Sequence, residues 1–397
     1  MSNNEPAMGP RQPWKAPGPL GGQGVEGWIK PSPVKAYAIM PEDKGKWANY
    51  DGQACLADAE RTAGIVGFSE VYYTAGLDTG YHINHNEDEG FYVLGGEVTF
   101  YAEGENVVAA PNTWLFVPRG RPHQFVVTEP AHLLIMNTPA NFEAFIMGVP
   151  SYTGAAFPPS PWPPASTPVP EDASPTSKYR KVFWDQTSGI AQYNIEYLDH
   201  PVKCWNPPKS AWALQPEPPI QAPAPDRQMD VSKVRAYAAT AEMRARLLKS
   251  YQSKGIMHIS VPLANSLSTG GVMGLTEFIT IPGADSGYHI NHNEDEVFYI
   301  LKGEVTFHAE GATVVGKPGT FVFAPRGHAH QYVVTGADGC DMLVFNLPGT
   351  FEQIVQQYNI LGVDMSAHYS LLNLEVIDHL PRFQQGPPWI VEPELLR

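Results

Sequence analysis

One ten-residue sequence, GYHINHNEDE, occurs twice in this chain of 397 residues, at Gly80–Glu89 and at Gly287–Glu296. Each copy is followed by a second histidine-containing segment, PRGRPH at Pro118–His123 and PRGHAH at Pro325–His330. The number of residues between the two segments is the same in both copies. A repeat with constant internal spacing indicates one domain that has been duplicated, with insertions confined to the regions outside it.

The repeated part is rich in short runs of β-branched and aromatic residues, separated by glycine, proline, asparagine or acidic residues. Such runs, with no helical pattern between them, predict an all-β fold with a sandwich or a barrel in each half, and a closed barrel or jelly roll would also hide the sheet edges. The paired glycines Gly95 and Gly96 are expected to form a hairpin turn between two of these strands. The strands expected in the first half are Val71–Thr74, Phe91–Leu94, Val98–Tyr101, Trp114–Val117 and Gln124–Thr128.

Short helices are expected beside the two barrels, at Phe142–Met147, Phe351–Tyr358 and Val231–Tyr251. Many of the 39 prolines lie between the repeats, where they predict a stiff, extended linker. The predicted division of the chain is an N-terminal extension (1–30), a first domain (31–150), the linker (151–228), a second domain (229–385) and a C-terminal tail (386–397).

Composition narrows the classes of partner. The formal net charge of −15 disfavours nucleic acid and anionic membranes, because both repel a negative surface. Three cysteines without a CxxC pair argue against a disulfide framework or a thiolate zinc site. The chain starts with a polar, proline-rich stretch and has no apolar run of about 20 residues. We therefore expect a cytoplasmic protein with no signal peptide, membrane partner or nucleic-acid partner.

Each half also carries the side chains that a first-row transition metal prefers, which are imidazoles and one carboxylate. The alternative is a metal-free duplicate in which the histidines form hydrogen bonds in the core. We predict one metal centre in each half, with Glu89 and Glu296 at the start of a strand as the carboxylates. The predicted ligands are His82, His85, Glu89 and His123, and their counterparts His289, His292, Glu296 and His330.

The second histidine of each set raises a question of strand geometry. Alternate residues of a strand share a face, so His82 and Asn84 point together and His85 points away. His85 can turn inward only where the alternation breaks, and the polar residues that follow favour a strand end there. We expect His85 and His292 to complete the ligand sets, and Asn84 and Asn291 remain the alternatives.

The two segments resemble the two motifs of the cupin superfamily, so the chain is similar to a bicupin with two tandem cupin barrels. Three departures from the motifs occur: Asn84 and Asn291 replace the second histidine, Asn112 replaces a glycine, and Val127 and Val334 replace an asparagine. The matching residues are Gly76, His82, Glu89, Gly96, Pro118, Gly120 and His123 in the first half, and Gly283, His289, Glu296, Gly303, Gly319, Pro325, Gly327 and His330 in the second.

Among bicupins, the chain looks most like the quercetin 2,3-dioxygenases. That resemblance implies one divalent metal in each domain, with iron or copper expected first and manganese or nickel also allowed. It implies a small aromatic or enolic substrate, such as a flavonol, whose ring opens with O2 after Glu89 or Glu296 accepts the hydroxyl proton. A homodimer is also allowed.

The same resemblance leaves other functions open. These are an oxalate decarboxylase-like activity, ring cleavage of gentisate-like catechols, isomerase action, and a non-catalytic binding or storage role. Ring cleavage of the gentisate type usually employs histidines alone, and Glu89 argues against it.

Overall fold

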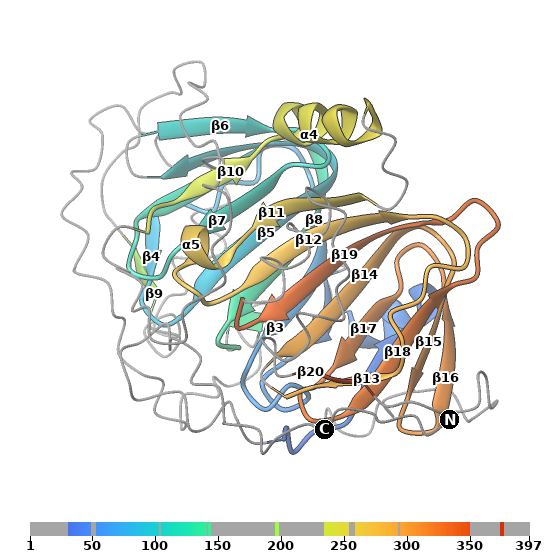
Figure 1. Cartoon of the computed structure of the whole chain (residues 1–397). Coiled ribbons are helices and arrows are strands. Elements are labelled where there is room, and N and C mark those ends of the chain that lie inside the picture. Colours follow the sequence, from blue (N-terminus) through green and yellow to red (C-terminus); the bar gives the residue numbers. More distant parts are fainter. Residues whose placement is uncertain are drawn as a thin grey trace, which may run out of the picture.

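The computed structural model of the chain describes residues 31–48, 53–102, 105–140, 142–143, 195–197, 234–253, 259–292, 294–349 and 374–376. These residues form antiparallel β-sheets, accompanied by the helices η1 (Pro41–Trp47), α4 (Ala241–Ser253) and α5 (Ser266–Thr269). The all-β fold with two tandem jelly-roll domains is therefore confirmed, and Figure 1 shows the two sets of strands packed side by side.

The first half is dominated by its two longest strands, β5 and β8, which pair antiparallel from Asp88↔Thr138 to Ala102↔His123. The sheet order is β10-β7-β5-β8-β3-β2, while β6 pairs with β5 and β4 pairs with both β8 and β9. The strands expected in this half fall within β3, β5, β7 and β8, except that Thr74 lies just beyond the end of β3. The strand bounds are β2 (Ala54–Ala57), β3 (Gly67–Tyr73), β4 (His82–Asn84), β5 (Asp88–Ala102), β6 (Glu105–Ala109), β7 (Trp114–Val117), β8 (His123–Thr138), β9 (Ile195–Tyr197) and β10 (Tyr237–Ala239).

The second half divides the same arrangement between two sheets, ordered β1-β17-β14-β19-β12-β11 and β16-β15-β18-β13-β20. The strand bounds are β1 (Tyr37–Ile39), β11 (Ile259–Ala264), β12 (Gly274–Thr280), β13 (His289–Asn291), β14 (Asp295–Gly303), β15 (Val305–Ala309), β16 (Ala312–Gly316), β17 (Phe321–Ala324), β18 (Ala329–Val334), β19 (Cys340–Leu347) and β20 (Leu374–Val376).

The two halves exchange edge strands. Strand β1 precedes the first repeat but pairs with β17 of the second, with Tyr37 opposite Phe323. Strand β10 precedes the second repeat but pairs with β7 of the first, with Tyr237 opposite Phe116, as Figure 1 shows. Buried side chains from both halves form one hydrophobic cluster as a result.

We keep 31–150 and 229–385 as proposed domain limits, with β1 and β10 exchanged between them. The segments 1–30 and 386–397 lie outside the described residues, and so does 151–228 except for β9. The helix expected at Phe351–Tyr358 also lies outside them, as does the one at Phe142–Met147 beyond its first two residues.

Two local expectations were wrong. Gly95 and Gly96 do not form a hairpin, because β5 runs without interruption from Asp88 to Ala102 and only shifts register against β8. A Cβ at Gly96, whose φ is +75°, would lie 1.9 Å from the carbonyl oxygen of Pro130, so only glycine fits this bulge.

The helix expected at Val231–Tyr251 begins only at Ala241, because Tyr237–Ala239 forms a strand against β7. Pairing with a neighbouring strand here overrides the local helical pattern. No helix in the described ranges combines the length and the apolar character that crossing a bilayer requires.

A buried polar cluster joins α4 to the sheet of the second half. Arg244 donates hydrogen bonds to Glu277, which is fully buried on β12, and lies 3.6 Å from a carboxylate oxygen of Asp341 on β19. Burial and the neighbouring Glu277 carboxylate raise the pKa of Asp341 to about 8. Asp341 therefore keeps a proton in the folded protein under conditions in which an exposed aspartate loses it.

This proton makes stability depend on pH. Between about pH 4 and pH 8 the folded chain holds a proton at Asp341 that the unfolded chain releases, so the free energy of unfolding falls as pH rises. We expect Asp341→Asn to remove this slope and to stabilise the protein at pH 9 by about 1 kcal/mol or more, since one unit of pKa shift corresponds to about 1.4 kcal/mol. Urea denaturation at pH 6 and pH 9 measures both effects, and an unchanged slope in the variant would contradict this assignment.

Candidate metal centres

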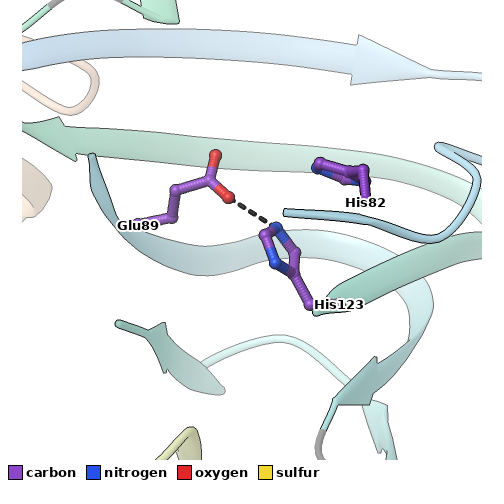
Figure 2. Close-up of side chains that lie close together, drawn as sticks. All are labelled: His82, Glu89 and His123. Atoms are coloured by element: carbon purple, nitrogen blue, oxygen red, sulfur yellow. Dashed lines mark ion pairs between the residues drawn. The ribbon is translucent and has the colours of Figure 1, made fainter. Parts of the chain in front are cut away.

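The first candidate centre brings together three side chains from different strands. His82 lies on β4 and His123 opens β8, and the two residues are direct partners across the antiparallel pair, with ring centroids 4.3 Å apart. Glu89, near the start of β5, places Oε2 2.6 Å from Nε2 of His123. All three side chains are buried and turned toward one another (Figure 2).

The second half reproduces this group. His289 on β13 faces His330 on β18, and the ring centroids lie 4.5 Å apart. The Oε2 atom of Glu296 is 2.7 Å from Nε2 of His330 and 3.9 Å from Nε2 of His289. The duplication has therefore preserved the geometry as well as the sequence.

Each of the four histidines uses Nδ1 in the same way, in contact with the carbonyl oxygen two residues earlier in the chain. A ring nitrogen that faces a carbonyl oxygen acts as a donor, and in a neutral imidazole this leaves Nε2 as the atom that can bind a metal. The four Nδ1···O distances are 2.8 Å for His82 with Gly80, 2.9 Å for His123 with Arg121, 2.9 Å for His289 with Gly287 and 3.1 Å for His330 with His328.

Electrostatics favour the neutral form of His82 and the ionised forms of Glu89 and Glu296. Burial, reinforced by the nearby His123, lowers the pKa of His82 to about 3. Burial alone would raise the pKa of Glu89, but the two histidines and the Asn137 amide outweigh it and hold that pKa below its usual range. Burial would likewise raise the pKa of Glu296, but His289 and His330 outweigh it and lower that pKa to about 2. These are the protonation states that metal binding requires.

The donor atoms fit a divalent transition metal. In each half, one atom from each of the three side chains lies within 4.8 Å of the other two. Metal bonds of about 2.0–2.2 Å place donor atoms about 3 Å apart. Nε2 of His123 and Oε2 of Glu89 are close and buried, yet neither makes a well-formed hydrogen bond in the described structure. Two histidines with one carboxylate suit first-row metals, iron included.

Neither group contains the second histidine of the sequence motif. His85 and His292 are half-buried and lie just beyond β4 and β13, where the strands end as expected. Their role as ligands stays a prediction. Asn84 and Asn291 are the last residues of those strands and are buried.

Sequence reasoning missed the amides that orient the glutamates. Nδ2 of Asn137 donates to Oε1 of Glu89 at 3.1 Å, and Nδ2 of Asn346 donates to Oε1 of Glu296 at 2.9 Å. Each bond holds one carboxylate oxygen and leaves the other facing the histidines. The signal that could have revealed them is their own recurrence, since both asparagines end the repeated part at matching positions.

A buried ion pair secures the turn before each distant histidine. The main chain and side chain of Arg119 both donate to Asp88, the residue before Glu89. Arg326 and Asp295 repeat the arrangement. These contacts indicate that both arginines stabilise the turn.

The two parts of the chain that contain the candidate centres both match a known protein family. Residues 69–137 and 277–346 each match the family model described as the Cupin domain. The chain is similar to the salicylate 1,2-dioxygenase of Pseudaminobacter salicylatoxidans, with 14% identity and a TM-score of 0.49 over 87% of this chain and 90% of that one. A mutant of that enzyme in complex with gentisate gives 13% identity and a TM-score of 0.50 over 88% of each chain.

Among curated proteins, the oxalate-binding protein of Thermotoga maritima is 37% identical over 62 residues, which make up 16% of this chain. The matched part is 51% of that protein, so the chain spans about half the length of the curated relative it matches.

Proposed function

The chain belongs to the cupin superfamily as a bicupin, and from this premise we propose that it is a metal-dependent dioxygenase that opens the ring of a flavonol or a related phenolic or enolic substrate with O2. The observation that carries the proposal is the buried His–Glu–His group of each domain, in which one potential ligand atom from each of three side chains lies within 4.8 Å of the other two. A divalent ion held there, when bound, supplies a Lewis acid that lowers the pKa of a substrate hydroxyl.

The side chains contribute proton transfer and orientation. Glu89 and Glu296 are the candidate bases for the hydroxyl proton, since each is ionised and has one oxygen facing the histidines. The amides of Asn137 and Asn346 fix the other oxygen, so that each carboxylate has a single orientation.

Charge favours an anionic substrate. With both histidines neutral, one carboxylate leaves a divalent ion with a net charge of +1, which binds a phenolate or enolate better than the neutral hydroxyl form. In the second half, the ring of Phe298 lies 6.5 Å from that of His330 and packs against Phe307 and Tyr332. This aromatic wall lowers the local dielectric and strengthens the attraction.

A second candidate is binding or decarboxylation of a small dicarboxylate such as oxalate. The observation that favours it is the 37% identity, over 62 residues, to a protein named as oxalate-binding. The same +1 centre would attract a carboxylate, so charge does not distinguish the two candidate functions. The reaction products do. Release of carbon dioxide and formate from oxalate, without net oxygen uptake, would identify the decarboxylase.

The test combines metal analysis of the purified protein with oxygen uptake against flavonols, gentisate, salicylate and other phenols. We expect one metal ion per domain and oxygen uptake with at least one of these compounds. A chelator should abolish the uptake and the returned metal should restore it. Bound metal without uptake on any phenol would remove the dioxygenase proposal, and less than about one tenth of a metal per chain would favour a binding or storage protein.

A further inference from the structure

Two buried carboxamides lie beside the candidate ligands without belonging to either His–Glu–His group. Asn84 is 1% exposed and Asn291 is 4% exposed. Each ends the three-residue strand that opens with His82 or His289. Residues two apart in a strand share a face, so each carboxamide leaves its strand on the side of the histidine.

The main-chain carbonyl groups of these asparagines accept hydrogen bonds, whereas polar atoms of their side chains lack partners in the described structure. The carbonyl oxygen of Asn84 accepts from the Gly120 amide at 2.7 Å, and that of Asn291 accepts from Gly327 at 2.8 Å. Within the described structure, both side-chain polar atoms of Asn84 and the Nδ2 atom of Asn291 are buried without a hydrogen-bond partner. A buried polar group left unsatisfied destabilises the folded protein. The same unsatisfied donor in both halves points to a ligand that satisfies it.

The chemistry of that donor selects the ligand. An N–H group cannot bind a cation, and an amide oxygen suits iron or copper less well than imidazole does. A donor beside a metal centre instead suits an oxygen anion that the metal also attracts.

We propose that Nδ2 of Asn84 and of Asn291 donates a hydrogen bond to an anionic oxygen of the substrate, a phenolate or enolate, and that neither asparagine is a metal ligand. The inference rests on the proposed function only in requiring a metal at each centre. It assigns the asparagines to substrate recognition and leaves metal binding to histidine and glutamate side chains.

The test uses the full chain loaded with Co²⁺ without oxygen, and 4-nitrocatechol as a chromophoric probe. Leucine has nearly the volume of asparagine and no donor. We expect Asn84→Leu and Asn291→Leu each to abolish one class of tight probe sites and to leave the Co²⁺ dissociation constant within about twofold of the parent value. The double variant should bind the probe about 10- to 100-fold more weakly, as expected for a hydrogen bond to a charged group.

Each single variant contains its own control, because the unaltered domain must still bind the probe tightly. Asn84→Asp with Asn291→Asp keeps the shape and exchanges the donor for a charge, so it should bind Co²⁺ more tightly and the probe more weakly. This pair also tests the inference if the leucine variants fail to fold.

Three results separate this inference from the proposed function. Co²⁺ binding weakened tenfold or more by the leucine variants, with unchanged probe affinity in the metal-loaded fraction, would make the asparagines ligands and overturn the inference. No change in either quantity would also overturn it. Probe binding that depends on the asparagines, in a protein that consumes no oxygen with any phenol, would support the inference and remove only the dioxygenase.

Discussion

Oxygen uptake on the active phenol is expected to fall below detection when Glu89 and Glu296 are both replaced by glutamine. A glutamine amide cannot accept the substrate proton, and loss of a general base costs about 10²–10⁴-fold in rate. An oxygen electrode gives the rate, and metal analysis of the same sample allows it to be expressed per bound ion. That correction is needed because each glutamate is both candidate ligand and candidate base.

The matched control makes the same chemical change away from the centres. Glu97 lies on β5, like Glu89, and accepts a hydrogen bond from Thr128, while Glu304 has the same relation to Thr335. Glu97→Gln with Glu304→Gln should leave the rate unchanged. Full turnover per metal in the Glu89 and Glu296 double variant would show that neither carboxylate acts as the base.

We expect Arg119→Met to destabilise the protein by about 3–5 kcal/mol, the cost of leaving a buried charge without its partner. Asp88, the partner, is 1% exposed, and Arg119 itself is 3% exposed. Because Asp88 precedes Glu89 and Arg119 lies on the turn before His123, metal affinity should fall as well. Equilibrium urea denaturation gives the change in the free energy of unfolding.

Two further variants test whether the unpaired buried charge causes this loss of stability. Lys46 pairs with Asp43 while its own side chain is 57% exposed, so Lys46→Met should cost less than about 1 kcal/mol. Replacing both members of the buried pair, as Asp88→Leu with Arg119→Met, should destabilise less than Arg119→Met alone, since no unpaired charge remains. A double variant as unstable as the single one would assign the loss to packing.

The repeat allowed most of the fold and the central residues of the candidate site to be predicted. Spacing alone placed His82, Glu89 and His123 in one set, and the structure brings them together. Spacing could not decide whether His85 is a ligand, because the direction of its side chain depends on where β4 ends. Sequence alternation shows which residues share a face but not the exact point at which a strand stops.

Contacts between segments that are distant in the sequence could not be predicted from it. Nothing local in Tyr37–Ile39 or Tyr237–Ala239 reveals that each pairs with the other half, since the partner of a strand is chosen by long-range packing. The bulge at Gly96 has the same origin, because the carbonyl that excludes a side chain there belongs to Pro130 on another strand.

The exchange of β1 and β10 makes the two halves inseparable as folding units. If the two halves were produced separately, β7 would lack β10 and β17 would lack β1. Each would then be an unpaired edge strand, which can pair with strands of other molecules and cause aggregation. The molecule is thus built like a domain-swapped dimer whose protomers are joined in one polypeptide. Because buried side chains of both halves form one hydrophobic cluster, we expect the two halves to unfold together in one cooperative transition.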